Sequence, residues 1–496
     1  MKKIFNIIYM ASFALVVASC NLDLTPSTKI VQDGAFITFA DAEKFANGLN
    51  TKYRSCFYGE AAYTAEVQSE MFNASLAYGN RNGSPHRMDG SFTTSDYNLR
   101  NVWRTSYVLI VNVNNFISNI DKIVPETDKE KASIAAFKGA AYFYRASVYH
   151  DLVRRYGPIS GSKINTADLG IPIITKVDIT LKPARNTVGE VYEQIAQDIQ
   201  EAKTYLASTS GVAGSIIPTI DAVKALEARV ALYKGDYAVA ASLSDELIKS
   251  GKYTLAATQK DMDNEWISDS GKECILQMYM DLSETPGDWG GSAVKNDIYL
   301  GYQTSTKKYI PDFIPTKTAI EMYESTDLRK STWFKELTCQ FSSTDYKVML
   351  FNKYQGNPTY ETAPNREYKH RPKVLRLGEL YLINAEANAM SNQTGLAKTA
   401  LNALQKARGA SLTDGTMAFI QAEWKKEMIG EGYRIDCLRR WNQGFSGRTP
   451  QNQDIVTEAG SDFTKKNAPA GFALFTWAIP DTEIQVNPNL VQNAGW

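Results

Sequence analysis

The amino-acid sequence predicts a mostly α-helical protein, a tetratricopeptide-like helical-repeat scaffold with long irregular loop excursions that carry minor β structure. Three observations predict this fold. Apolar residues recur at steps of three or four along several stretches, which places them on one helix face. An alanine-rich pair of such stretches flanks a Gly-Asp-Tyr turn between residues 221 and 249, as in a helical repeat. Long tracts without helical period separate the helices, which are expected as pairs at about 102–156, 188–250 and 377–441.

Residues 1–19 have the pattern of a secretory signal peptide. Lys2 and Lys3 precede an apolar run over residues 4–19, which is shorter than the roughly 20 residues that span a bilayer. The run ends in Val-Ala-Ser directly before Cys20, and this ending resembles a bacterial lipobox. We therefore expect cleavage before Cys20 and lipidation of that cysteine. A plain signal peptide followed by an incidental cysteine is the alternative.

Local signals mark where individual helices begin and end. The apolar stripe over residues 134–156 stops at a Gly-Pro pair, which breaks a helix. Thr187 and Glu190 have the spacing of a capping box that opens the next helix. Gly235 is placed to end one helix of the alanine-rich pair in the left-handed conformation. A second such pair is expected over residues 377–408, where small residues allow the helices to approach closely.

Three tracts between the helices have no helical period and are rich in Gly, Asn, Ser, Thr and aromatic residues. They cover about 76–101, 256–319 and 338–372. Structureless loops longer than about 15 residues are uncommon in compact domains and often carry function. We expect these excursions to decorate one domain that spans residues 20–496, and we expect ligand binding on them.

Composition excludes several classes of protein. With 54 basic and 54 acidic residues the formal net charge is zero, so no overall field attracts nucleic acid. Three histidines and five cysteines without a Cys-x-x-Cys motif argue against a zinc or redox site, and the cysteines after Cys20 are expected as free thiols. The acidic run 261–265 lacks the glycine of an EF-hand because Trp266 stands there. We expect no metal and no cofactor.

The sequence also predicts no catalytic site. Glu423, Glu427 and Glu431 follow one another at steps of four, as on one helix face. The carboxylates of a glycosidase must flank the scissile bond from opposite sides, which neighbours on one helix cannot do. These acids are instead expected to face solvent or to pair with the nearby arginines, Arg434, Arg439 and Arg440. We therefore predict a binding protein that is not an enzyme.

Aromatic residues of two excursions are candidates for ligand contact. Rings flanked by glycine are expected to be partly exposed, because glycine supplies no packing surface. An exposed flat ring suits the apolar face of a pyranose, and neighbouring amide and guanidinium groups can bind its hydroxyls. The alternative is that the rings pack the loops onto the helices. The candidates are Tyr78, Arg81, Tyr97 and Asn98 in the first excursion and Trp289, Tyr299 and Tyr302 in the second.

Several segments resemble the SusD/RagB family of Bacteroidetes nutrient-binding lipoproteins. They follow the family order from the signal peptide with Cys20 to the C-terminus. The other segments are Phe-Lys-Gly-Ala-Ala-Tyr-Phe-Tyr-Arg-Ala at 137–146 with Asp-Leu-Val-Arg-Arg-Tyr-Gly at 151–157, Pro-Ala-Arg-Asn-Thr-Val at 183–188, residues 222–253, Glu-Gly-Tyr-Arg at 431–434 with Asp-Cys-Leu-Arg-Arg-Trp at 436–441, and residues 478–496.

The resemblance implies a lipoprotein anchored to the outer membrane and exposed at the cell surface. Such a protein captures an oligo- or polysaccharide and delivers it to a SusC-like TonB-dependent transporter. Because family members commonly bind through aromatics on such excursions, the resemblance places ligand contacts at the seven candidates above. Two alternatives stay open, a peptide-binding relative of the RagB kind and a helical-repeat adaptor whose ligand is a protein.

Overall fold

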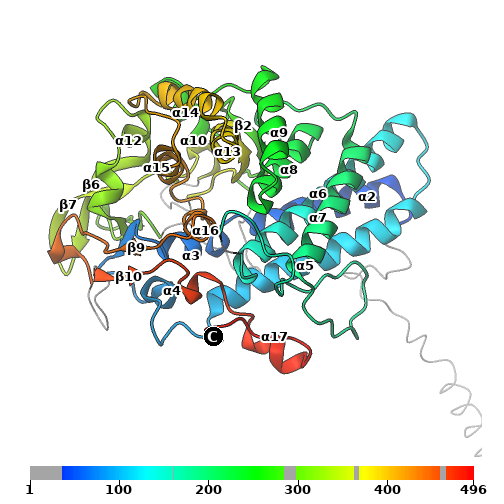
Figure 1. The fold of residues 1–496 in the computed structure, drawn as a ribbon, viewed down its shortest axis with the longest axis horizontal. Helices are drawn as coiled ribbons and strands as arrows, with labels where there is room; N and C mark the ends of the chain where they lie inside the picture. Colours follow the sequence, from blue (N-terminus) through cyan, green and yellow to red (C-terminus); the bar gives the residue numbers. More distant parts are fainter. Residues whose placement is uncertain (1–35, 160, 284–297, 362–367, 458–464) are drawn as a thin grey trace, which may run out of the picture.

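The computed structural model describes residues 36–159, 161–283, 298–361, 368–457 and 465–496. Helices dominate, as the sequence predicts (Figure 1). The helices of the first half are α2 (Phe39–Ser55), α3 (Glu60–Val67), α4 (Gly83–Arg87), α5 (Tyr97–Asn119), α6 (Asp128–Tyr156), α7 (Val188–Leu206), α8 (Ile220–Lys234) and α9 (Tyr237–Lys249). Those of the second half are α10 (Gln259–Trp266), α11 (Lys317–Glu321), α12 (Leu328–Trp333), α13 (Leu377–Met390), α14 (Thr394–Arg408), α15 (Met417–Glu427), α16 (Arg434–Arg440) and α17 (Asp481–Val486).

The helix boundaries follow the local signals in the sequence. The capping box at the start of α7 is confirmed, because the Glu190 amide donates to Thr187 Oγ1 at 3.2 Å and the Thr187 amide donates to Glu190 Oε2 at 2.8 Å. Gly235 ends α8 at φ 90° and so confirms the left-handed cap. The helix pairs α8 with α9 and α13 with α14 lie where the alanine-rich stretches predict them.

Helix-to-helix packing builds the main core. α6 packs against α5 and α7, and its residues Val148, Tyr149 and Leu152 are almost completely buried. α9 packs against α13, although more than a hundred residues separate them in the sequence (Figure 1). This contact joins the helices of the first half to those of the second.

The minor β structure lies in and next to the excursions, except for β9 and β10 near the C-terminus. The strands are β1 (Phe72–Ala74), β2 (Cys274–Gln277), β3 (Tyr302–Gln303), β4 (Lys308–Tyr309), β5 (Phe313–Pro315), β6 (Phe334–Phe341), β7 (Thr344–Phe351), β8 (Lys373–Arg376), β9 (Phe445–Ser446) and β10 (Asn467–Ala468). The hairpin β6–β7 pairs antiparallel, and β4 and β3 extend it to four strands in the order β3-β4-β6-β7. Two-stranded pairs β1–β5, β2–β8 and β9–β10 tie distant segments together.

The predicted partners of the three stepping glutamates were wrong. α15 ends at Glu427, and Glu431 lies in the turn that follows, so the three acids do not share one helix. Glu423 accepts a hydrogen bond from Arg329 at 2.5 Å, and Glu431 accepts one from Arg376 at 2.7 Å. The expected arginines point elsewhere because α16 is a separate helix: Arg434 pairs with Glu70, Arg439 donates to backbone carbonyls, and Arg440 pairs with Glu386.

These contacts form a buried group of charges that we call the Glu427 cluster. It consists of Glu273, Arg329, Arg376, Arg408, Glu423, Glu427 and Glu431. Glu427 lies at its centre and pairs with three guanidinium groups, one each from α12, β8 and α14. These guanidinium groups lower the pKa of Glu427 well below its usual value, against the effect of burial. The cluster therefore holds five separate segments in one arrangement: the residue before β2, α12, β8, α14, and α15 with the turn that follows it.

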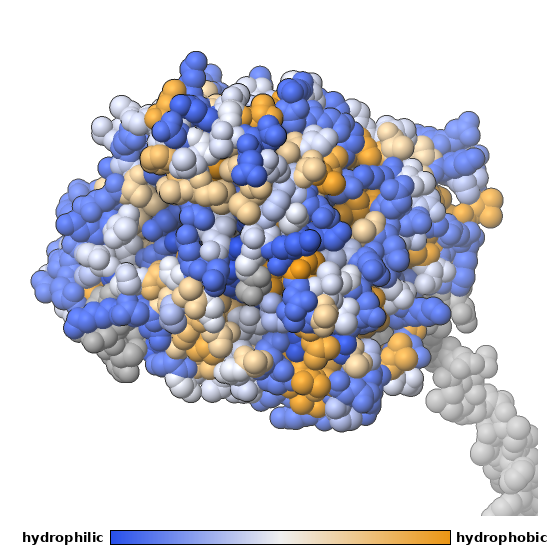
Figure 2. All heavy atoms as spheres, viewed as in Figure 1, coloured by the Kyte–Doolittle hydropathy of each residue, from blue (hydrophilic) through white to orange (hydrophobic). Residues whose placement is uncertain are grey.

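Cys56, Cys274, Cys339 and Cys437 are free, as predicted, and all four are buried. None of the helices in the described ranges is long and apolar enough to cross a membrane. Figure 2 shows a mainly hydrophilic face with apolar patches, one of them at the lower edge over α17. Val486 and Val491 are more than half exposed in this part of the chain.

Candidate functional site

The first and second excursions meet next to a strand pair. β1 and β5 run antiparallel with Phe72 opposite Pro315, and the amide of Ser75 donates to the carbonyl of Asp312 at 2.8 Å. Beyond this pair, the half-exposed Arg81 forms an ion pair with the Asp312 carboxylate. Two tracts that are more than 200 residues apart in the sequence therefore share one surface.

The loop after β1 has an unusual backbone. Asn80, Asn82 and Met88 have φ values of 63°, 54° and 48°, which residues with a side chain adopt rarely. Asparagine tolerates this conformation better than most residues, whereas methionine does not. Strained loop backbone of this kind is concentrated at ligand-binding sites, because the surrounding contacts must hold it in place.

Arg87 organises the polar side chains of this loop. Its guanidinium donates to Asn80 Oδ1 at 2.7 Å, to the Tyr78 hydroxyl at 3.2 Å and to Ser91 Oγ at 2.9 Å. Asp89 lies 3.3 Å from the same guanidinium. Amide, hydroxyl, guanidinium and carboxylate groups are thus held in fixed positions at the surface, and these are the groups that bind sugar hydroxyls.

Tyr97 supplies an exposed ring beside this polar group. It is the first residue of α5, which Asp96 caps, and its side chain is 40% exposed. Its hydroxyl accepts a hydrogen bond from the amide of Asn82 at 3.4 Å, which ties the ring to the loop. Partial burial raises the pKa of the Tyr97 hydroxyl, so the group is neutral at physiological pH. We call Tyr78, Asn80, Arg81, Arg87 and Tyr97 the Tyr97 surface.

The second excursion contributes Tyr302 at its edge. Tyr302 begins β3, its ring is half-buried against Tyr309 with centroids 5.2 Å apart, and its amide donates to the Tyr368 hydroxyl at 2.8 Å. Binding by Tyr78, Arg81, Tyr97 and Tyr302 remains a prediction. Trp289, like Cys20, the predicted site of lipidation, lies outside the described residues.

The expected exposure of Tyr299 was wrong. Its side chain is 2% exposed and its ring packs against Phe72 at 4.8 Å and Phe351 at 5.1 Å between centroids. The neighbouring Gly301 has φ 57°, and a Cβ there would lie 2.1 Å from the carbonyl oxygen of Ile310. Glycine therefore permits a sharp turn that inserts Tyr299 into the core, where we had expected it to leave the ring in solvent.

Asn98, the amide candidate for ligand contact, is also buried. It is the second residue of α5, and its amide group donates to Asp96 Oδ1 at 3.0 Å. The position is explained by the helix start: Asp96 accepts from the first amides of α5 and draws the Asn98 side chain inward.

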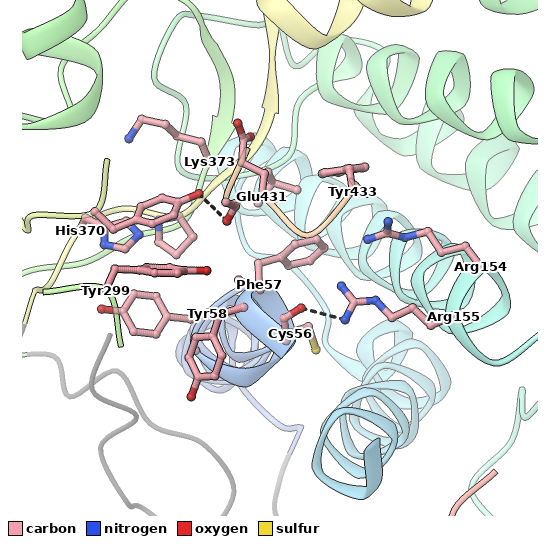
Figure 3. Close-up of a pocket in the computed structure, with 18 residues that line it drawn as sticks. Cys56, Phe57, Tyr58, Arg154, Arg155, Tyr299, His370, Lys373, Glu431 and Tyr433 are labelled. Carbon is pink, nitrogen blue, oxygen red and sulfur yellow. Dashed lines mark hydrogen bonds between the residues drawn. The ribbon is translucent and has the colours of Figure 1, made fainter. Parts of the chain in front are cut away.

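Tyr299 lines an aromatic cavity beneath the surface. Figure 3 shows Tyr58, Tyr299 and His370 gathered on one side of it and Arg154 and Arg155 of α6 on the other. His370 stacks on Tyr354 with centroids 5.0 Å apart, and burial lowers the pKa of His370 to about 4. The cavity volume is about 50 Å³, which admits water and is too small for a sugar ring.

Sequence reasoning missed Arg87 and the aromatic residues around this cavity. Arg87 stands four residues before Ser91 and seven after Asn80, but nothing local distinguishes it from a solvent-exposed arginine. The hydroxyl of Tyr58 donates to the carbonyl of Tyr368, 310 residues away, so no pattern along the chain could reveal this contact. Among the described residues, no group of three or more His, Cys, Asp or Glu side chains is arranged to hold a metal ion.

Two family models match the chain. One, described as starch-binding and associating with the outer membrane, matches residues 22–232. The other, described as the SusD family, matches residues 338–496. Together they cover about three quarters of the chain and include the first excursion, the third and the C-terminal segment.

Individual proteins agree with these models. The chain is 26% identical over 466 residues to SusD-like protein P2 of Formosa agariphila, which covers 88% of this chain and 86% of that protein. A SusD superfamily protein from Bacteroides thetaiotaomicron has a similar fold, with a TM-score of 0.76, 24% identity and coverage of 92% of this chain and 100% of that one. Surface glycan-binding protein A of Bacteroides thetaiotaomicron superposes with a TM-score of 0.70, 17% identity and coverage of 93% and 100%.

Proposed function

Because the chain belongs to the SusD/RagB family, we propose that it captures an oligo- or polysaccharide at the Tyr97 surface and delivers it to a SusC-like TonB-dependent transporter. In this proposal Cys20 carries the lipid that anchors the protein to the outer membrane, with the domain exposed at the cell surface. The protein binds and hands over its ligand without cleaving it.

One observation carries the proposal: an exposed ring stands beside a fixed set of polar groups. Tyr97 is 40% exposed while Asn80 and Tyr78 are bound to Arg87 at 2.7 and 3.2 Å. A ring and pre-positioned donors and acceptors lose little entropy on binding, which is what a hydroxylated ligand with an apolar face requires. The description of one family model as starch-binding, and the name of surface glycan-binding protein A, support the same ligand class.

The test is retention of the purified protein in gels that contain different polysaccharides, followed by titration calorimetry with the best ligand. Tyr97→Ala should weaken binding about tenfold, since an aromatic contact contributes about 1.4 kcal/mol. Phe419→Ala is the matched control, because Phe419 is 43% exposed on α15. Retention that Tyr97→Ala leaves unchanged would remove the Tyr97 surface from the proposal.

Adding peptides to the ligands tested separates the alternatives. A protein that binds peptides but no polysaccharide would be a RagB-like peptide carrier. A protein that retains neither and associates only with another protein would be a helical-repeat adaptor. Delivery is tested separately, by asking whether the protein co-purifies with a TonB-dependent transporter from outer membranes and whether Cys20→Ser abolishes anchoring.

A further inference from the structure

A second, larger cavity is lined by residues between 158 and 494, and none of them belongs to the Tyr97 surface. It is formed where the loop before α7, the end of α16 and the C-terminal segment (red in Figure 1) come together. Arg185 of the loop donates to the carbonyl of Val491 at 2.9 Å, and Asn493 donates to the carbonyl of Tyr156 at 2.8 Å. Its volume is about 460 Å³, within the range of small-molecule sites and enough for a sugar ring.

Two buried guanidinium groups line this cavity, Arg185 and Arg439, and each is 7% exposed. Arg185 donates to the carbonyls of Gly170, Leu169, Val491 and Tyr156, and it forms no ion pair with any residue in the described ranges. Arg439 donates to two carbonyls and to Thr476 Oγ1 at 3.0 Å, and its nearest carboxylate, Asp436, lies 3.9 Å away.

These two arginines differ from those of the Glu427 cluster. Direct carboxylate partners raise the pKa of Arg376 well above its usual value, against the effect of burial. Burial instead lowers the pKa of Arg185 and of Arg439 to about 10, because carbonyl dipoles replace most of the counter-charge. Both groups remain charged at physiological pH, so the cavity wall carries positive charge that the protein does not fully neutralise.

The remaining lining residues define the shape and polarity of a ligand. The lining contains one carboxylate, that of Asp168, against two guanidinium groups, so its net charge is positive. Asp168 Oδ1 already accepts a hydrogen bond from Asn165 at 2.8 Å. Asn442 is exposed, and its side-chain amide forms no hydrogen bond with any group that the structure describes. Phe472 adds a half-buried ring. An anionic group, hydroxyls and an apolar face are the complement of this wall.

We propose that this cavity binds a carboxylate-bearing sugar unit, a uronic acid, with the carboxylate toward Arg185 and Arg439 and the ring toward Phe472. The inference rests on the proposed glycan capture and makes it more specific: the glycan contains acidic sugars, and one unit is held in this cavity, whose lining includes none of the Tyr97 surface residues. Asn442 would bind a ring hydroxyl at the cavity wall.

The test is titration calorimetry of the purified protein with glucuronate, galacturonate, glucose and acetate. We expect the uronates to bind at least about tenfold more tightly than either glucose or acetate, because only they present both the charge and the ring. No binding of either uronate at millimolar concentration, or equal binding of glucose, would overturn the inference. Acetate that binds as tightly as the uronates would overturn the assignment to a sugar.

A pair of matched variants places the site. Asn442→Asp adds a negative charge to the cavity at an exposed position and should weaken uronate binding at least about tenfold. Gln443→Glu makes the same amide-to-acid change at the next residue, which is exposed and does not line the cavity, and should leave binding unchanged. Equal effects of the two variants, or none from Asn442→Asp, would overturn the site.

The same measurements keep the two proposals apart. Tyr97→Ala should reduce polysaccharide retention while uronate binding persists. If Tyr97→Ala leaves polysaccharide retention unchanged while the protein still binds uronate, the result would count against the proposed capture surface alone. Polysaccharide retention with no uronate binding would count against the cavity alone.

Discussion

The first and second excursions have similar compositions but place their aromatic residues differently. In the first, Arg87 and Asn80 hold the loop together through polar contacts, and Tyr97 stays exposed at the start of α5. In the second, the turn at Gly301 directs Tyr299 into the core. Glycine shows where a chain can turn sharply, whereas the location of the partner residues, polar for Tyr97 and aromatic for Tyr299, decides which side of the turn faces solvent.

The largest expected difference between the two excursions is in the free energy of unfolding lost by Tyr299→Ala and by Tyr97→Ala. Removing this buried ring should lower the free energy of unfolding by about 3–5 kcal/mol, through lost transfer energy and the cavity left behind. Tyr97→Ala should change it by less than about 0.5 kcal/mol, since surface positions tolerate substitution. Urea denaturation measures both. Equal stability of the two variants would contradict the structural contrast.

A second variant at position 299, Tyr299→Phe, removes the hydroxyl and keeps the ring. The Tyr299 hydroxyl is buried and has no hydrogen-bond partner in the part of the chain that the structure describes. Tyr299→Phe should therefore be neutral or slightly stabilising, because it removes an unsatisfied polar group and keeps the ring.

Gly301→Ala should have the second-largest effect. An alanine there meets both the left-handed backbone at φ 57° and the Ile310 carbonyl oxygen at 2.1 Å. Gly251→Ala is the control, because Gly251 has φ 69° and open space around it. The control should lose about 1 kcal/mol and Gly301→Ala about 2–3 kcal/mol in urea denaturation. Equal losses would show that the turn tolerates a side chain.

The dependence of stability on pH should report on Glu66, a buried acid of α3. Burial raises the pKa of Glu66, whose charge acts on Tyr299, to about 7, above its value of about 4.5 in an unfolded chain. A raised native pKa means that the native state binds more protons between these values, so this group's contribution to stability falls as pH rises from about 4.5 to about 7.

Glu66→Gln should remove this contribution and flatten the change in the urea midpoint between about pH 5 and about pH 8. Glu70→Gln is the contrasting variant, because Arg434 and Lys425 lower the pKa of Glu70 to about 2 despite its burial. Replacing Glu70 should cost stability across the whole range. A wild-type slope that survives Glu66→Gln would place the responsible group elsewhere.

Tyr302→Ala should have a smaller effect on stability than Tyr299→Ala or Gly301→Ala. The ring is half-buried and its aromatic contact with Tyr309 contributes about 1 kcal/mol. In the polysaccharide gels it should weaken retention less than Tyr97→Ala does, because less of its ring is available. A larger loss than that of Tyr97→Ala would move the main contact from the first excursion to the second.

Much of the scaffold could be predicted from the sequence because its signals are local. The apolar stripe before Tyr156, the capping box at Thr187 and the turn at Gly235 each lie within a few residues of the feature they specify. The candidate site could be predicted only as two tracts. The Arg81–Asp312 ion pair joins residues 231 positions apart, and no periodicity encodes which distant segments meet.

The errors have the same origin. Glu423 and Glu431 were assigned to arginines nearby in the sequence, yet their partners Arg329 and Arg376 come from other segments. Tyr299 was assigned to solvent from its glycine neighbours, although the side of the turn it occupies depends on Phe72 and Phe351.

The Glu427 cluster also bears on how the chain reaches its native state. Its charges come from the residue before β2, from α12, β8, α14 and α15, and from the turn after α15, where Glu431 is the last of them in chain order. Any shorter piece would have to bury guanidinium groups without their partners, at a cost of several kcal/mol. We expect the native arrangement to close in one cooperative step, and only once the segment that carries Glu427 and Glu431 is present to pair with the three arginines.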